Sequence, residues 1–422
     1  MKSSSIVILD NGASTIKAGL LGVHDDQPLI IPNAVVRSKG DNATYIGHEL
    51  AKCRDYTSIR YRLPFEKGFL VDWDAQKAVW DGIFSSDVNT SEASLLITEP
   101  YFNLPNVQDV YDQFVFEEYE FQSYCRCTPA SLVPYGRLLA HTGLAPPECL
   151  LVIDSGFSFT HVVPIINGAV VWEAVKRIDV GGKLMTNHLK EIISFRQWNL
   201  MEETHIVNEV KEACCFVSDD FTRDLEACRV QPTRNAIVQE YIFPDYSANR
   251  PGRIRRAGET LDDSRQTLVM NNERFTVPEI LFHPTDIGYA TVAASISLLP
   301  EDLQGMFWAN IGLIGGNTAL PGFRQRLPIL EAYYSAVAFA ARPEFAQCVV
   351  TKEEYQESGS NACRRKFRDW KPVEKEATRS REQGKGKGIE SQMDVEGDDI
   401  PPPTKKTMRG RGRGRGAARR QV

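Results

Sequence analysis

Two short segments, far apart in the chain, have the same sequence pattern. Residues 6–21 contain an apolar run, the turn Asp10-Asn11-Gly12 and a second apolar run, and residues 150–163 repeat this order around Asp154-Ser155-Gly156. Glycine lets the backbone turn tightly so that N–H groups point at an anion. An aspartate at a strand end can hold hydrated Mg²⁺ through water. Either pattern alone is usually only a turn, but together they predict two loops that grip the phosphates of a nucleotide.

Three further sequence features could contribute to a nucleotide-binding site. Lys17 follows the first loop and could reach the same phosphates as a point charge. Gly315-Gly316 ends a strand-like run and is followed by Asn317, Leu320 and a Pro-Gly pair, which permits the backbone to approach a flat ligand closely. Lys211-Glu212, on a predicted helix, offers a cation and a carboxylate for a ribose. Each feature alone is usually a turn or a solvated face, and only their order is specific.

The elements that position these residues are predicted from periodicity. Apolar runs at 5–9, 95–98, 149–153 and 311–314 end at Gly, Pro or Asp, as buried strands do. Helical spacing appears at Val79/Ile83, at Met185/Leu189/Ile193 and at Ile206/Val210/Cys214. This alternation predicts a layered α/β fold, and 422 residues are enough for two domains.

The last residues differ from the rest of the chain. Residues 379–422 contain twelve Lys/Arg and six Asp/Glu, which gives them a net charge of +6. Because the whole chain has a net charge of −6, residues 1–378 have a net charge of −12. Residues 372–422 are too polar to fold alone and are predicted to be disordered. An Arg-Gly segment offers charged hydrogen bonds to phosphates, or else only solubilises the chain. The expected nucleic-acid contacts are Arg409, Arg411, Arg413, Arg415, Arg419 and Arg420.

Composition excludes several classes of protein. The apolar runs are too short to cross a bilayer, and the N-terminus does not read as a signal peptide. Nine cysteines without a CxxC pair argue against a disulfide framework or a zinc site, and for a reducing compartment. We therefore expect an intracellular protein with no membrane partner.

The order of the two loops, the paired glycines and the Lys-Glu pair resembles the actin superfamily. The resemblance to actin and its relatives covers about residues 5–370 and includes Thr98-Glu99-Pro100 and Thr351-Lys352-Glu353-Glu354-Tyr355. More narrowly, 154–161 (DSGFSFTH), Gly181-Gly182-Lys183-Leu184 and Phe116-Glu117-Glu118-Tyr119 look like the sixth class of actin-related proteins.

The resemblance implies an actin-like ATPase fold, with two similar domains of mixed sheets around a central nucleotide cleft. The first domain would comprise 1–140 and 324–371, with an outer insertion near 32–67. The second would comprise 141–323, with an outer insertion near 181–262. The implied cofactor is ATP or ADP with Mg²⁺, which Asp10 and Asp154 would hold through water only. The residues expected to bind the nucleotide are Asp10, Asn11, Gly12, Ser14, Lys17, Asp154, Ser155, Gly156, Gly182, Lys211, Glu212, Gly315, Gly316, Asn317 and Leu320.

Departures from the actin pattern decide the expected mechanism. Where actin has a further Asp and a Gly in the second loop, this chain has Phe157 and Ser158, and Gly136 stands where actin places the Gln that orients water. The first-loop serine becomes Ala13, with Ser14 beside it. Phosphoryl transfer rests on positioning and charge stabilisation. We therefore expect that nucleotide is bound but not turned over, and we assign no catalytic residue.

Two other departures affect surfaces. The loop that links actin subunits in filaments is reduced to a few residues at 38–44, which argues against a homopolymer. The Trp-x-Gly-Gly element that actins carry near the adenine is missing between Phe323 and Phe345.

The sixth class implies a scaffold role. Its members sit in Swr-type remodelling complexes that exchange a variant histone into nucleosomes. The expected partners are the remodelling ATPase and other subunits of the complex, with histones and nucleosomal DNA contacted indirectly or through the tail. The expected location is the nucleus, with a cytoplasmic pool, and the expected role is in transcription regulation. The alternatives are a slow ATPase and a cytoskeletal filament protein.

Overall fold

The fold is described from a computed structural model. It describes residues 5–24, 27–40, 42–57, 59–84, 88–136, 147–262, 265–282, 295–323 and 345–367. The predicted disordered tail at 372–422, with the six arginines expected to contact nucleic acid, lies outside these ranges. So does the segment 324–344, which includes most of the stretch that lacks the Trp-x-Gly-Gly element.

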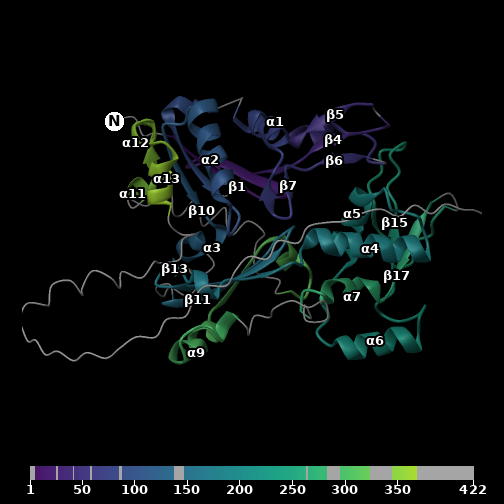
Figure 1. The fold of residues 1–422 in the computed structure, drawn as a ribbon. Coiled ribbons are helices and arrows are strands. Elements are labelled where there is room, and N and C mark those ends of the chain that lie inside the picture. The colour runs from purple at the N-terminus through teal and green to yellow at the C-terminus, as the bar shows by residue number, and fades with distance from the viewer. Residues whose placement is uncertain are drawn as a thin grey trace, which may run out of the picture. The chain divides into compact units, whose positions relative to one another are not determined.

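A six-stranded mixed sheet forms from the apolar runs of the first half of the chain (Figure 1). β1 (Ser5–Asn11) pairs antiparallel with β2 (Thr15–Leu20) and parallel with β9 (Ala93–Thr98). The order across the sheet is β19-β10-β9-β1-β2-β3. The other strands are β3 (Leu29–Pro32), β10 (Ser123–Cys127) and β19 (Val350–Thr351). Since β19 pairs with β10, the chain returns to its first sheet near residue 350.

A second mixed sheet repeats this arrangement. β11 (Cys149–Ser155) pairs antiparallel with β12 (Thr160–Ile166) and parallel with β18 (Ile311–Ile314). β13 (Ala169–Val170) and β14 (Lys176–Ile178) also pair with β12. Each half therefore contains a hairpin whose first strand runs beside a parallel strand. The predicted strands at 5–9, 95–98, 149–153 and 311–314 are confirmed.

The three predicted helices are also confirmed: α1 (Trp73–Phe84), α4 (Gly182–Arg196) and α5 (Thr204–Cys214). They bury Val79, Leu189 and Val210, which lie on the predicted apolar faces. The other α-helices in the described ranges are α2 (Pro105–Gln113), α3 (Pro129–Leu132), α6 (Phe221–Val230), α7 (Glu273–Glu279), α9 (Glu301–Ala309), α11 (Phe345–Cys348), α12 (Lys352–Ser358) and α13 (Ser360–Lys366). None of the helices in the described ranges combines the length and apolar character that crossing a bilayer requires.

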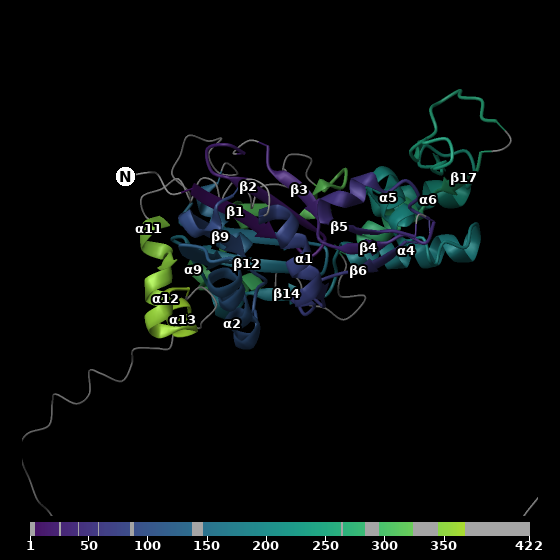
Figure 2. The same ribbon diagram turned by 90° about the horizontal axis from the view of Figure 1, so that it is seen from above.

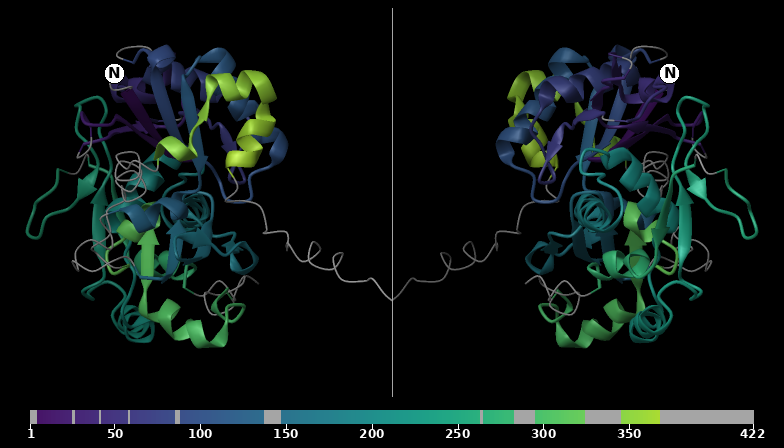
Figure 3. Two further views of the ribbon diagram at one scale, coloured as in Figure 1. Left: turned by 90° about the vertical axis from the view of Figure 1, so that its left-hand side faces the viewer. Right: turned by 90° about the vertical axis from the view of Figure 1, so that its right-hand side faces the viewer.

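The C-terminal helices pack on the first half of the chain. Figures 2 and 3 show α11 to α13 beside the first sheet, and α13 contacts α2. Thr351 begins α12 through a reciprocal capping pair: its hydroxyl accepts a hydrogen bond from the Glu354 N–H at 3.2 Å, and the Glu354 carboxylate accepts one from the Thr351 N–H at 3.0 Å.

Two small sheets lie outside the main ones. The first contains β4 (Val35–Arg37), β5 (Thr44–Ile46) and β6 (Arg60–Arg62), and both Figure 1 and Figure 2 place it beside α4 and α5. The second contains β15 (Gln239–Ile242), β16 (Arg253–Ile254) and β17 (Thr267–Met270). Arg37 pairs directly with Thr44, which leaves the short loop predicted at 38–44. A two-stranded hairpin is formed by β7 (Phe65–Glu66) and β8 (Phe69–Leu70).

All nine cysteines lie in the described ranges and form no disulfide, and eight of them are buried. Cys214 and Cys215 belong to the apolar core under α4 and α5. No group of three or more His, Cys, Asp or Glu residues in the described part of the chain could hold a metal ion by itself.

Candidate nucleotide-binding cleft

The first predicted loop joins β1 to β2, and its aspartate is fixed on both sides. Asp10 Oδ1 accepts a hydrogen bond from Thr98 Oγ1 at 2.8 Å, and its Oδ2 lies 3.3 Å from Lys17 Nζ. The Asn11 side chain bonds to Tyr111 at 3.2 Å and to Trp80 at 3.3 Å, both in the core. Asn11 therefore anchors the loop, while Asp10 and Lys17 form its charged surface.

The second predicted loop joins β11 to β12. Asp154 lies at the strand end, but Ser155 is fully buried and does not line the cavity. Its hydroxyl lies 2.9 Å from Thr160 Oγ1 and accepts from Asn317 Nδ2 at 3.1 Å. The prediction that Ser155 contacts the nucleotide is therefore wrong for its side chain, because alternation along the strand turns this residue inward.

The paired glycines after β18 bring a third backbone segment to the same place. Gly315 has a φ of +92°, and a Cβ there would lie 2.3 Å from the Ser155 carbonyl oxygen. Only glycine allows the ends of β18 and β11 to approach this closely. The next turn, η8 (Gly316–Ala319), brings Asn317 against the second loop, where its amide donates to the Gly156 carbonyl at 2.8 Å.

The fourth element is formed by α4 and α5. Lys211 Nζ donates to Asn208 Oδ1 at 2.8 Å, to Thr186 Oγ1 at 2.9 Å and to the Gly182 carbonyl at 3.3 Å. Burial lowers the pKa of Lys211. Glu212 Oε1 accepts a hydrogen bond from the Asn208 amide at 2.8 Å. Lys211 thus holds the helices together, whereas Glu212 is the more accessible of the pair.

These four elements enclose one cavity of about 580 Å³. Fourteen of the fifteen residues expected to bind a nucleotide line it: Asp10, Asn11, Gly12, Ser14, Lys17, Asp154, Gly156, Gly182, Lys211, Glu212, Gly315, Gly316, Asn317 and Leu320. The volume lies within the range of small-molecule and cofactor sites.

Several lining residues were missed by the sequence analysis, and Tyr101 is the most informative of them. Its hydroxyl donates to Asp154 Oδ2 at 2.9 Å and accepts from the Ala130 N–H at 3.1 Å. Its ring lies 4.4 Å from the His161 ring, between centroids. Because Tyr101 follows β9 and Asp154 lies near the end of β11, this hydrogen bond joins the two halves. Its position three residues after Thr98 was the available signal.

Asp154 is placed to interact with a cation. Burial is the main cause that raises its pKa to about 6, and the charge of Asp10 raises it too, while the Tyr101 hydroxyl and Lys17 act in the opposite direction. A divalent cation between the Asp10 and Asp154 carboxylates would favour the ionised form of Asp154. The donor set therefore fits a hydrated Mg²⁺ held by two carboxylates and a ligand's phosphates.

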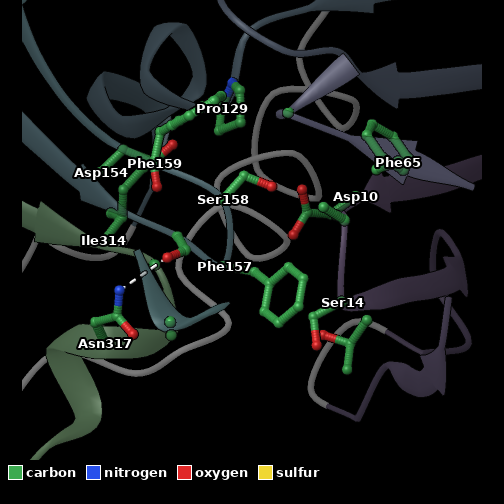
Figure 4. Close-up of a pocket in the computed structure, with 18 of the residues that line it drawn as sticks. Asp10, Ser14, Phe65, Pro129, Asp154, Phe157, Ser158, Phe159, Ile314 and Asn317 are labelled. Carbon is green, nitrogen blue, oxygen red and sulfur yellow. Dashed lines mark hydrogen bonds between the residues drawn. The ribbon is translucent and has the colours of Figure 1, made fainter. Parts of the chain in front are cut away.

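Phe157 gives this cavity its distinctive feature. Figure 4 shows its side chain pointing from the second loop into the cavity, toward Ser14 and Asp10 of the first loop. Ser158 lines the cavity beside it. Gly136, at the end of η4 (Val133–Tyr135), is not among the lining residues. Neither a phenyl ring nor a glycine can orient water for attack on a phosphate.

The outer insertions of the two halves touch through a group of side chains that we call the outer clasp: Tyr56, Tyr61, His205, Glu209 and Tyr246. His205 stacks on Tyr56, with ring centroids 4.6 Å apart, and its Nδ1 lies 2.9 Å from the Tyr61 hydroxyl. Its Nε2 lies 3.3 Å from Glu209, and Tyr246 contacts Tyr56. The clasp therefore connects β6 and the segment before it to α5 and to the segment that follows β15.

Deeper in the cleft, a second contact spans the halves. Phe159 packs on Gly68, where an added Cβ would lie 2.3 Å from the ring. The Arg177 guanidinium lies 3.7 Å from the centroid of the same ring. Together with the Tyr101 hydrogen bond, these contacts hold the two halves against each other around the cavity.

Two halves with the same hairpin-and-strand pattern, and an Asp-x-Gly loop from each facing one cavity, define an actin-like fold. Residues 1–329 match the actin family, and the chain belongs to that family. Three relatives share the designation actin-like or actin-related protein 6. An "Actin-like protein ARP6" of Cryptococcus neoformans is 48% identical over 418 residues, which cover 87% of this chain and 85% of that protein. The "Actin-like protein ARP6" of Yarrowia lipolytica is 39% identical over 391 residues, covering 86% and 97%. The "Actin-related protein 6" of Drosophila melanogaster is 34% identical over 392 residues, covering 85% and 98%.

Proposed function

We propose that this chain is a non-catalytic scaffold subunit of a nuclear, Swr-type chromatin-remodelling complex that exchanges a variant histone. The proposal combines the likeness to actin-related protein 6 with the cleft. The observation that carries the non-catalytic part is Phe157, which projects into a cavity that otherwise keeps its nucleotide-binding residues.

The cleft has the residues that binding requires. Asp10, Lys17 and Asp154 would face the phosphates and their Mg²⁺, the glycines at 315–316 would face the base, and Glu212 would face the ribose. A bound nucleotide would join the two halves, since each contributes a phosphate loop. Ligand binding of this kind stabilises the folded protein by mass action. In this proposal the nucleotide is a structural cofactor.

Within the described residues, Phe157 and Gly136 occupy the two positions at which actins carry groups for hydrolysis. Attack on a phosphate needs an oriented water and compensation of developing charge. Phe157 and Gly136 supply neither hydrogen-bond donors nor acceptors from their side chains. A slow ATPase remains the second candidate, because Asp154 and Tyr101 form a polar pair at the cavity wall.

Affinity purification of the tagged full-length chain, followed by identification of its partners, tests the scaffold role. The proposal expects a remodelling ATPase and other subunits of one nuclear complex, in constant ratio to the chain. Recovery with cytoskeletal filaments, or of the chain alone from nuclear extract, would contradict it.

A further inference from the structure

The second phosphate loop is fixed in position by its hydrogen bonds to α4. The Phe157 carbonyl accepts from the Lys183 N–H at 2.9 Å, and the Gly156 carbonyl accepts from the Gly182 N–H at 3.0 Å. Asn317 Nδ2 adds a third bond at 2.8 Å. A Cβ on Gly181 would lie 2.6 Å from the Phe157 oxygen, so the loop and the helix start are in close contact.

This arrangement has two consequences for anion binding. The amides at the start of α4 are the usual anion donors of a helix, but here Gly182 and Lys183 donate to the protein's own loop. Because the backbone of Phe157 is held, its side chain can leave the cavity only by rotating. A phenyl ring is at least as large as a phosphate group, and it donates no hydrogen bond to phosphate oxygens.

The charges that line the cavity also disfavour an additional phosphate. Within the described residues the lining includes four carboxylates (Asp10, Glu99, Asp154 and Glu212) and two lysines. Lys211 is committed to three oxygens at the α4–α5 contact. Lys17 is the lysine beside the phosphate loops, and it is already paired with Asp10 at 3.3 Å.

We propose that this cleft selects a nucleoside diphosphate over a nucleoside triphosphate, because the Phe157 side chain occupies the space that a terminal phosphate would need. This inference rests on the nucleotide-binding part of the proposed function. Phe157 is then a specificity-determining residue: it leaves the base, the ribose and the inner phosphates in place and excludes the outermost phosphate.

The test is calorimetric titration of the full-length chain, freed of nucleotide, with Mg-ADP and with the β,γ-imido analogue of Mg-ATP, which cannot be hydrolysed. Mg-ADP should bind at least about tenfold more tightly than the analogue, because forcing a bulky group into a filled site weakens binding by about this factor. Phe157→Ala should raise the affinity for the analogue about tenfold and change that for ADP by less than about threefold. Phe157→Leu, the matched control, keeps most of the bulk and should keep the preference. Unchanged ADP affinity also shows that each variant is folded.

Equal or tighter binding of the analogue by the native chain would overturn the inference, and so would a preference that Phe157→Ala does not alter. Absence of binding of either nucleotide would overturn it together with the nucleotide-binding part of the proposed function. The scaffold role is decided separately, by the partners recovered with the chain.

Discussion

Arg126 is a fully buried charge that pairs with the cleft residue Glu99, and its replacement should be strongly destabilising. It lies in β10 with a fully buried side chain, 3.2 Å from Glu99 Oε2 and 2.5 Å from Asp112 Oδ1. Burial raises the pKa of Asp112 to about 6, and the charge of Arg126 opposes this rise. In Arg126→Met the two carboxylates would stay buried without a counter-charge, which costs about 3–5 kcal/mol.

The expected change in melting temperature follows from the size of the folded unit. The unit comprises residues 1–372, and an unfolding entropy of about 2.1 cal/mol/K per residue gives a total of about 0.8 kcal/mol/K. Arg126→Met should therefore lower the Tm by about 4–6 °C in circular dichroism melts. The variant Arg126→Met/Glu99→Gln/Asp112→Asn should recover at least half of this loss, because no buried charge remains.

Arg62→Met is the matched control for this experiment. Arg62 pairs with Asp72 at 2.5 Å, but its side chain is 54% exposed. Exposed pairs contribute little to stability, so its replacement should change the Tm by no more than about 1 °C. If Arg126→Met and Arg62→Met lower the Tm equally, the inference that burial makes this cluster decisive is wrong.

Three further predictions concern the outer insertions and the tail. His205→Ala removes the Tyr56 stack and the Tyr61 hydrogen bond of the outer clasp, so release of a fluorescent nucleotide, measured by stopped flow, should accelerate about 5- to 30-fold. The control His188→Ala, on the neighbouring helix α4, should leave the release rate unchanged. Equal release rates for the native chain and His205→Ala would rule out a role for the clasp in nucleotide release. The short loop at 38–44 predicts that the chain stays unpolymerised under salts that polymerise actin, and sedimentation into ATP-dependent filaments would contradict this. Truncation after Trp370 should weaken DNA binding without changing the Tm. For the isolated tail, a plot of the logarithm of the DNA-binding constant against the logarithm of the salt concentration should have a slope of roughly −4 to −5 if four to six arginines contact phosphates. Equal DNA affinities for the full-length and the truncated chain would mean that the tail only solubilises the protein.

The sequence predicted the parts of the site that lie on single elements. The strand ends at Asp10 and Asp154 and the glycines at 315–316 were found because an apolar run followed by a turn signals the end of a strand. The helix that presents Lys211 was found from its apolar spacing. These features are local, so the structure reproduces them.

The contacts between the halves could not be predicted in the same way. The Tyr101–Asp154 hydrogen bond and the Tyr56–His205 stack join residues that are distant in the chain, and no local pattern encodes such pairs. A loop motif does not tell which of its side chains face a ligand, and pleating directs the Ser155 side chain into the core.

The likeness to actin supplied what the residues alone could not. The significance of Phe157 depends on knowing which residues actin has there, and the structure adds that its side chain enters the cavity. The proposed role in chromatin remodelling rests on the likeness to one branch of the family and not on the geometry of the cleft.

Phosphate release distinguishes a cleft that holds a nucleotide without hydrolysing it from a working ATPase site. Purified chain at saturating Mg-ATP should release phosphate no faster than the Asp154→Ala variant, while retaining nucleotide that elutes after denaturation. Asp154→Ala is the appropriate control because it removes a loop carboxylate that a working site would need. Sustained phosphate release by the native chain, lost in Asp154→Ala, would show that the cleft is a working ATPase and contradict the account.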